Sequence, residues 1–384
     1  MSQSNPRLSL IIPTRERAET LRYALKTAVE QKSDAIEIIV SDNFSKDNTR
    51  EIVQSYDDPR VRYVNTGRPM SMCGNFEFAL EQARGEYVLF IGDDDAVLPG
   101  GLDKLLAEMD AHPSPIYSWP MPAYYWPLKD KKAYTTYIPT PTEPHDIDLK
   151  KLARFVVKHG GWQYYRIPCV YQAAVHRSIP DAIRAKAGKV FPATQPDVFT
   201  SMAIPAFADR ARNIGYSITS LGYCPKANGI SLVSGSGPSN LERWYKEFGD
   251  YKLHPTLCLE LNYIVQVITD AILIAMERFP EFYGGMKFNY EAAWAFNYRL
   301  YGKLCDRREL LRKRKLVQQR HPFNVMKFLA YCAMHDIIAR RQEMRKQRYI
   351  RESLVAGTPD NIRDFVHQLA RKEQTPGTPS FSLR

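Results

Sequence analysis

The sequence predicts an α/β fold with a doubly wound, mainly parallel sheet, followed by a mainly helical C-terminal extension. Short apolar runs alternate with segments of helical periodicity over residues 8–100, and this alternation is typical of parallel sheets. The run from Tyr87 to Ile91 is apolar without alternation, which indicates a strand buried on both faces. From Leu241 to Leu369, apolar residues recur at helical spacing.

The N-terminal part is expected to contain four successive strand and helix units. Strands are expected at residues 8–13, 36–40, 61–64 and 87–91. The helices between them are expected at residues 21–29, at about 48–56 and from about Asn75 to Ala83. Because parallel strands place their carboxyl ends at one edge of the sheet, ligands are expected to bind at that edge.

Polar residues follow the ends of these expected strands. Thr14, Asp42 and Asn65 each come at or just after a strand end, and Asp93, Asp94 and Asp95 follow the buried run. Three adjacent carboxylates repel one another unless a cation neutralises them. Mg²⁺ or Mn²⁺ takes oxygen ligands from one or two carboxylates and fills its other positions with water and phosphate oxygens. The triplet therefore predicts a divalent metal and a phosphate-bearing ligand. The alternative is a solvated acidic turn in which Asp95 caps the helix after Pro99.

Residues 120–146 are expected to form a loop, because prolines interrupt any long regular element there. Aromatic residues are interspersed among the prolines. They are candidates for the wall of a sugar site, or they pack the loop onto its own domain. They are Tyr124, Tyr125, Trp126, Tyr134 and Tyr137.

The formal net charge of +11 is concentrated in one segment. Residues 303–351 contain fifteen Lys and Arg against four Asp and Glu, so the rest of the chain is neutral. A basic helical segment suits peripheral contact with an anionic membrane, or it is simply a solvated helix face. Nucleic acid is not expected as a partner, because no binding motif accompanies the charges and the ligand edge of the sheet carries acids.

The remaining features predict a cytoplasmic protein, with peripheral attachment at the inner face of the plasma membrane as an option. The six cysteines lack CxxC spacing, so neither a zinc site nor a disulfide framework is expected. The N-terminus lacks the basic and apolar regions of a signal peptide. Polar residues interrupt the apolar stretch 257–276, which indicates a core helix rather than a membrane span.

Several short motifs occur in the order found in family 2 glycosyltransferases, and the chain resembles an inverting, nucleotide-sugar-dependent enzyme of GT-A type. The resemblance is strong over residues 7–110 and loose over 111–235. It rests on Leu10 to Thr14, Val40 to Asn43, Asn75, Ala83 to Tyr87 and Phe90 to Asp95. It implies transfer of a sugar from a UDP-sugar, or another nucleoside diphosphate sugar, to a hydroxyl of a glycan or lipid-linked acceptor in cell-surface polysaccharide synthesis.

The resemblance also implies roles for individual residues. Thr14, Asp42, Asn75 and Asp93 match nucleotide-binding positions, although Asn75 is equally suited to be a helix N-cap without ligand contact. Asp94 and Asp95 match metal-binding positions for Mn²⁺ or Mg²⁺. The family more often has an acid where Gly92 stands, so the choice of ligand within the triplet stays open. Arg15 and Arg17 could meet the diphosphate or remain solvated.

An acid that opens a later apolar helix is the candidate general base. Asp197 follows Pro196 at the point where similar enzymes carry the base, and a placed carboxylate that deprotonates the acceptor hydroxyl contributes roughly 10²–10⁴ in rate. An ordinary helix-terminal acid is the alternative, and Asp181 and Asp209 are the other candidates for the base.

Two other functions and the domain division complete the predictions. A sugar-1-phosphate nucleotidyltransferase would need a glycine-containing phosphate loop after the first strand, and residues 13–18 contain no glycine. A non-catalytic, basic membrane-surface adaptor is the second alternative. We expect a GT-A-like domain at 1–240, a helical basic region at 241–370 and a disordered tail at 371–384.

Overall fold

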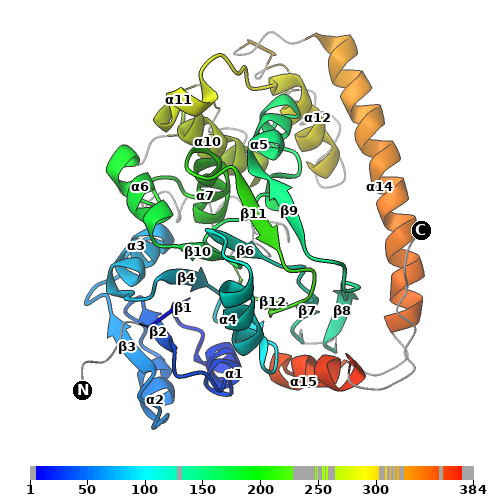
Figure 1. The fold of residues 1–384 in the computed structure, drawn as a ribbon. Helices are drawn as coiled ribbons and strands as arrows, with labels where there is room; N and C mark the ends of the chain where they lie inside the picture. The colour runs from blue at the N-terminus through cyan, green and yellow to red at the C-terminus, as the bar shows by residue number, and fades with distance from the viewer. Residues whose placement is uncertain are drawn as a thin grey trace.

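The computed structural model describes residues 6–127, 132–227, 264–301, 324–353 and 358–373, together with a few isolated positions between these ranges. Its centre is an eight-stranded sheet in the order β3-β2-β1-β4-β10-β6-β11-β9 (Figure 1). The four N-terminal strands lie where the sequence predicts them and pair in parallel. They are β1 (Leu8–Thr14), β2 (Ile36–Asp42), β3 (Val61–Asn65) and β4 (Tyr87–Phe90).

The second half of the sheet is mixed. β10 (Ala174–His176) runs antiparallel to both β4 and β6 (Ile116–Ser118). β11 (Arg210–Asn213) is parallel to β6, and β9 (His145–Asp148) closes the edge antiparallel to β11. The predicted doubly wound, mainly parallel sheet is therefore confirmed, with antiparallel strands confined to this half.

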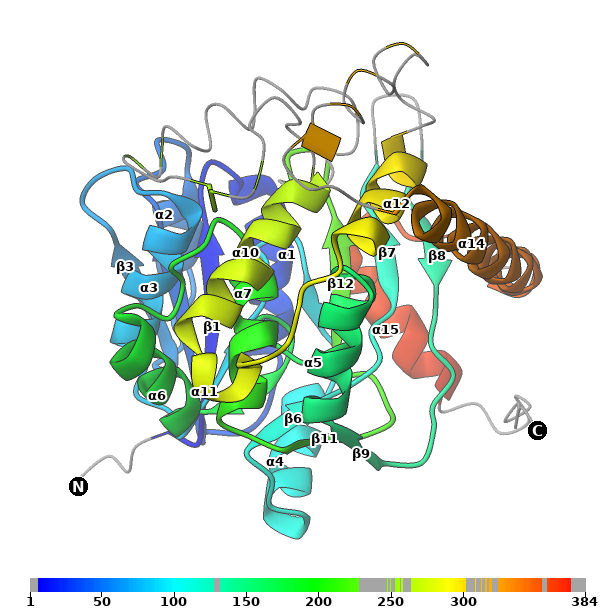
Figure 2. The ribbon, with the colours of Figure 1, turned by 90° about the horizontal axis from the view of Figure 1, so that it is seen from above.

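Helices cover both faces of the sheet, as Figure 2 shows from above. Residues of β1 and β2 alternate between two buried layers, so Ile11 and Ile39 enter one core while Leu10 and Ile38 enter the other. The first core includes residues of α3 (Met72–Gln82), α5 (Leu149–Lys158), α6 (Ser178–Ala187), α7 (Pro196–Ala203) and α10 (Ile264–Arg278). The second includes residues of α1 (Ala18–Val29), α2 (Thr49–Gln54) and α4 (Gly101–Ala111).

A second, four-stranded sheet has the order β5-β12-β7-β8. It contains β5 (Ala96–Val97), β7 (Ala123–Tyr125), β8 (Tyr134–Tyr137) and β12 (Thr219–Tyr223). The expectation of a plain loop over 120–146 is therefore wrong. The strands there are only three or four residues long, so prolines between them do not prevent pairing, and β7 pairs with β12, which is distant in sequence.

The described C-terminal residues are mainly helical, as predicted. α10 packs on α7 and shares its core, followed by α11 (Pro280–Tyr283), α12 (Tyr290–Tyr301), α14 (Val325–Ser353) and α15 (Ile362–Glu373). The predicted boundary at 240 lies outside the described residues, as do residues 374–384, while residues 371–373 form the last turn of α15. No described helix has both the length and the apolar character needed to cross a bilayer.

Candidate active site

The site lies at the carboxyl edge of the parallel strands. Thr14 and Asp42 are the last residues of β1 and β2 and face each other in register. The acidic triplet follows β4, which pairs with β1 on its other side. The hydroxyl of Thr14 donates a hydrogen bond to Oδ2 of Asp93 at 2.7 Å. Thr14, Asp42 and the three acids are all buried, so the sheet topology brings together residues that are far apart in sequence.

Neighbouring groups fix the orientation of the Asp42 carboxylate. Its Oδ2 accepts hydrogen bonds from the hydroxyl of Tyr63 at 2.6 Å and from Nδ2 of Asn65 at 3.0 Å. Its Oδ1 accepts from the backbone N–H of Ser45 at 2.9 Å. Two of these donors come from β3, so the third strand positions the carboxylate at the end of the second.

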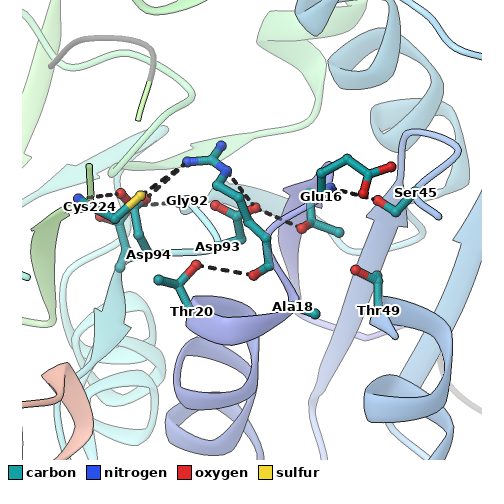
Figure 3. A network of polar contacts seen from close by, with 12 residues as sticks. Glu16, Ala18, Thr20, Ser45, Thr49, Gly92, Asp93, Asp94 and Cys224 are labelled. Atoms are coloured by element: carbon teal, nitrogen blue, oxygen red, sulfur yellow. Dashed lines mark hydrogen bonds and ion pairs between the residues drawn. The ribbon is translucent and has the colours of Figure 1, made fainter. Parts of the chain in front are cut away.

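A partly buried arginine, Arg17, faces the first two acids of the triplet, Asp93 and Asp94, which are labelled in Figure 3. Nε of Arg17 lies 3.1 Å from Oδ2 of Asp93, and Nη1 lies 3.9 Å from Oδ1 of Asp94 and donates to Sγ of Cys224. Burial alone would lower the pKa of Arg17, but the charges of Asp93 and Asp94 outweigh it and raise the pKa well above the usual value. Arg17 is therefore a fixed cation within the site. Arg15, in contrast, pairs with Glu247 at 3.0 Å.

Asp93 keeps one oxygen without a protein partner. Its Oδ1 is buried and accepts no hydrogen bond from the described residues. Burial raises the pKa of Asp93 to about 6, although the charge of Arg17 acts to lower it. A buried acceptor without a partner is costly, so this oxygen is suited to a ligand that brings a donor.

Two backbone N–H groups of β12 and the residue after it hold the other two acids. The N–H of Cys224 donates to Oδ2 of Asp94 at 3.0 Å, and the N–H of Gly222 donates to Oδ1 of Asp95 at 2.7 Å. A side chain at Gly222 would clash with the backbone, because its Cβ would lie 1.6 Å from the carbonyl oxygen of Asp94. Only glycine permits this close approach.

Asp95 is saturated with donors. Its Oδ2 accepts from the N–H of Gly92 at 2.6 Å, from the hydroxyl of Tyr171 at 2.6 Å and from Nε2 of Gln172 at 2.5 Å. Burial and the nearby charge of Asp94 raise the pKa of Asp95 to about 7. The alternative in which Asp95 caps the following helix is wrong, since α4 begins at Gly101 after an N-cap glycine.

The donor set of the triplet fits a hard cation that takes most of its ligands from a phosphate and water. Within the part of the chain that is described, no three or more His, Cys, Asp or Glu side chains cluster as a metal site. Oδ1 of Asp94 lies 3.9 Å from Nη1 of Arg17, which is beyond hydrogen-bond distance. One available carboxylate matches the way Mg²⁺ and Mn²⁺ bind together with a substrate diphosphate, and it does not match an all-protein zinc site.

Asn75 is bound to the neighbouring strand. Its Oδ1 accepts from the hydroxyl of Ser41 at 2.7 Å, and its Nδ2 donates to the carbonyl oxygen of Ser41 at 3.1 Å. The N-cap of α3 is Ser71, which accepts from the N–H of Gly74. The alternative of Asn75 as an N-cap is therefore wrong, and the helix begins at Met72, earlier than expected. In the structure, Asn75 fixes α3 to the end of β2.

Asp197 lies in the first turn of α7, directly after Pro196, as predicted. Burial raises the pKa of its carboxyl group. Burial raises the pKa of Tyr164, and the nearby charge of Asp197 and the neighbouring Tyr223, which lies between Gly222 and Cys224, raise it further. Two neighbouring polar atoms, Oγ1 of Thr194 and Nε2 of Gln195, are buried without a partner among the described residues. Asp197 is therefore half-buried, and the two residues before Pro196 carry buried polar atoms without a partner among the described residues.

The two other candidates for the base lie in solvated ion pairs. Asp181 lies within 3.9 Å of both Arg177 and Arg184, and Asp209 pairs with Lys150 at 2.6 Å. Both side chains are more than half exposed. Both are more exposed than Asp197, which is half-buried.

Most of the predicted aromatic residues of 120–146 pack within the fold. Tyr124 and Trp126 are buried in a cluster with α15. Tyr125 stacks between Tyr134 and Tyr223, with ring centroids 4.5 Å and 4.7 Å apart. Tyr223 thus joins this aromatic stack, and it lies between Gly222 and Cys224, whose N–H groups hold Asp95 and Asp94.

Several residues of the site were not predicted. They are the partners that hold the triplet from distant segments: Tyr171, Gln172, Gly222 and Cys224. Each lies in a short strand or turn without a local motif. The only usable signal was the pair of glycines, Gly92 and Gly222, at positions of close backbone approach.

Comparison with known proteins places the N-terminal part of the chain in context. The model of glycosyl transferase family 2 matches residues 9–167. A GalNAc(5)-diNAcBac-PP-undecaprenol beta-1,3-glucosyltransferase of Campylobacter jejuni is 41% identical over 104 residues, covering 26% of this chain and 34% of the relative. The succinoglycan biosynthesis protein ExoO of Rhizobium meliloti is 28% identical over 106 residues, covering 28% and 30%.

The chain spans about a third of the length of these curated relatives. Among solved structures, S. aureus TarS 1-349 in complex with UDP-GlcNAc is 15% identical, with a TM-score of 0.48 over 86% of this chain and 91% of that one.

Proposed function

Residues 9–167 belong to glycosyl transferase family 2, and on this premise we propose that the chain transfers a sugar from a UDP-sugar to an acceptor hydroxyl, with inversion. The proposed acceptor is a glycan or a lipid-linked glycan, and the proposed setting is the synthesis of a cell-surface polysaccharide. The Campylobacter relative is a glucosyltransferase that acts on a PP-undecaprenol-linked glycan, and this supports an acceptor of the same kind.

The observation that supports this proposal most strongly is the buried set of acceptors at one sheet edge. Asp42 ends β2, Asp93 and Asp94 follow β4, and Oδ1 of Asp93 has no partner in the described part of the chain. A nucleoside supplies the matching donors, because ribose carries hydroxyls and uracil carries an imide N–H. In this proposal Asp93 binds the ribose, and Asp42, with Thr14 nearby, faces the base. Asn75 contributes by holding α3 against β2.

Asp94 is the proposed metal ligand. A bound divalent metal would neutralise the charge that develops on the diphosphate leaving group. The backbone N–H of Cys224 holds one oxygen of Asp94 and leaves Oδ1 for coordination. Asp95, which the sequence also suggested for the metal, is less suited, because four hydrogen bonds already use its oxygens. Its proposed role is to position the loop that carries Asp94.

Arg17 adds a second positive charge to the same place. Its guanidinium contacts Asp93 and lies 3.9 Å from Asp94, so it is within reach of a diphosphate bound at these acids. A guanidinium can donate two hydrogen bonds to a phosphate. In the proposed reaction Arg17 therefore binds the diphosphate and helps to stabilise it as it leaves.

Asp197 is the proposed general base. Its half-buried carboxyl group has a raised pKa, so its carboxylate is a stronger proton acceptor than a solvated aspartate. It takes the proton of the acceptor hydroxyl as that oxygen attacks the anomeric carbon, and the bond to the diphosphate breaks on the opposite face. The product has the inverted configuration, and no covalent enzyme intermediate forms.

The experiment uses the purified full-length chain with UDP-sugars and Mn²⁺. UDP release should depend on the metal and should be lost in Asp94→Ala. Asp57→Asn, which changes an exposed acid, is the matched control and should keep full activity. NMR of the product should show an inverted anomeric centre. Metal-independent activity in Asp94→Ala would remove the metal assignment, and absence of turnover with every nucleotide sugar would remove the proposed reaction.

A further inference from the structure

α14 is a long helix that lies along the outside of the molecule (Figure 1). It packs against α12 and also contacts β8. Its inner face is apolar: Phe328 and His335, one heptad apart, are buried, and Tyr331 and Cys332 are half-buried between them. The hydroxyl of Tyr331 accepts a hydrogen bond from Nδ2 of Asn289 at 2.9 Å. The inner face therefore accounts for how α14 is attached to the body.

The outer face of α14 is also apolar. Met326 is 73% exposed, Leu329 is 51% exposed and Ile337 is 54% exposed. Met326, Ala330, Ala333 and Ile337 follow one another at spacings of four, three and four residues, which places them on one line of the helix. This line lies opposite Phe328 and His335. A helix at the surface of a globular protein ordinarily presents polar residues on that side, so this surface indicates an interaction site.

Basic residues accompany this apolar line. Lys327 is exposed near its start, and Arg340 and Arg341 are exposed one turn beyond Ile337. In the sequence, residues 303–351 carry fifteen Lys and Arg against four acids. A second copy of the same helix would bring two strongly positive segments together. An anionic surface with an apolar interior complements both properties, since it accepts the apolar side chains and pairs with the cations.

We infer that α14 binds an anionic lipid bilayer, lying in its interface with Met326, Leu329 and Ile337 inserted and Arg340 and Arg341 at the headgroups. The inner face stays on α12, so the helix binds the membrane without leaving the body. A nucleic acid would use the arginines and leave the apolar line unused. This inference does not depend on the proposed transferase reaction, because binding is measured without any sugar donor.

The test is co-sedimentation of the full-length protein with vesicles of phosphatidylcholine alone or mixed with phosphatidylglycerol. The protein should bind only the mixed vesicles. The triple variant Met326→Ser/Leu329→Ser/Ile337→Ser should lose affinity for the mixed vesicles by roughly tenfold or more. Arg340→Glu/Arg341→Glu should show a similar loss. Two controls change residues elsewhere on the surface. Tyr165→Ser removes an exposed large hydrophobic side chain outside α14, and Arg22→Glu/Lys26→Glu makes the same charge change on α1. Both should bind like the wild type.

Thermal melting confirms that each variant is folded before binding is compared. A tryptophan introduced as Leu329→Trp should shift its emission to shorter wavelength on the mixed vesicles if the side chain enters the lipid. The inference is overturned if the wild type does not bind, if only the charge variant loses binding, or if light scattering shows a dimer that the triple variant dissolves. Vesicle binding without transferase activity would keep this inference and refute only the proposed reaction.

Discussion

The indole Nε1 of Trp126 donates a hydrogen bond to the backbone carbonyl oxygen of Asp94 at 3.0 Å. Trp126 is the residue directly after β7 of the second sheet, and it is buried in the cluster that contains Phe365 of α15. Trp126 therefore fixes the backbone of Asp94, the proposed metal ligand, and α15 packs against Trp126.

Trp126→Phe should lower kcat/KM about three- to tenfold, because it keeps most of the packing and removes one hydrogen bond worth about 1 kcal/mol. The loss should be larger at low Mn²⁺, since the loop that carries Asp94 would be less well ordered. Steady-state kinetics over a range of Mn²⁺ concentrations measure this effect. Tyr87→Phe, which removes a bond from a buried ring to the carbonyl of Ser114, is the matched control and should leave the metal dependence unchanged.

Asp197→Asn should lower kcat by roughly 10²–10⁴ without lowering the melting temperature. Because burial raises the pKa of Asp197, its ionised form is destabilising near neutral pH, and the stability it contributes below pH 4 is lost as the pH rises through its folded pKa. A neutral asparagine avoids this cost. Asp181→Asn and Asp209→Asn should retain activity; loss of activity in either one, with normal activity in Asp197→Asn, would reassign the base.

The pH dependence of the wild type should reflect the same group. A base must be ionised to act, so kcat/KM should fall on the acid side with an apparent pKa above about 3.9, the value of an unperturbed aspartate. Rates measured from pH 4 to 8, with metal and donor held at fixed concentrations, give this limb. A limb that persists unchanged in the residual activity of Asp197→Asn would assign it to another group.

Asp95→Asn should act mainly on stability. The change removes acceptor capacity for the N–H of Gly92, the hydroxyl of Tyr171 and the amide of Gln172, and buried donors left without partners cost about 1–3 kcal/mol each. The melting temperature should fall by several degrees. Asp94→Asn should change it less but should abolish the further rise that Mn²⁺ with UDP produces in the wild type. The opposite pattern would make Asp95 the metal ligand.

Glu30 anchors α15, so Glu30→Gln should loosen that helix. Nε and Nη2 of Arg363 lie 2.8 Å and 2.6 Å from Oε1 of Glu30, and Nε2 of His367 lies 2.9 Å from Oε2. Burial acts to raise the pKa of Glu30, but the hydrogen bonds from Arg363 and His367 outweigh it and lower the pKa. The stabilisation is therefore present above about pH 4.5 and is lost as the pH falls through the folded pKa.

With partial exposure taken into account, the loss in Glu30→Gln should be about 1 kcal/mol at pH 7. Hydrogen exchange of residues 362–373 measures this loss. Glu19→Gln, which changes an exposed acid in the first turn of α1, the helix that ends at Glu30, is the control. Equal protection of α15 in both variants would contradict the anchoring role.

The first four strands could be predicted from the sequence because each is rich in apolar residues, and polar residues follow at or near its end. The gathering of Thr14, Asp42 and Asp93 followed from one topological rule, that parallel strands end at one edge. Arg17 was predicted as a residue that could meet the diphosphate. Its position beside two acids depends on how α1 packs, which the local sequence does not specify.

The second sheet could not be predicted in the same way. β5 has two residues and β7 has three, too few for any periodicity to be detected. Gly222 and Cys224 lie far from the triplet in sequence, and only the folded chain shows that their N–H groups hold Asp95 and Asp94. The sequence placed Asn75 near the start of a helix but did not indicate its partner. In the structure its side-chain amide forms hydrogen bonds with Ser41, which joins α3 to β2.

The contact between Arg363 and Glu30 joins positions 333 residues apart in the sequence. α1 therefore obtains this contact only after α15 has been synthesised. While the protein is being synthesised, Leu98 and Trp126 remain uncovered until Ile362 and Phe365 have left the ribosome. A truncation before Ile362 would thus remove the helix that packs on Trp126, and would leave the loop of the acidic triplet without this support.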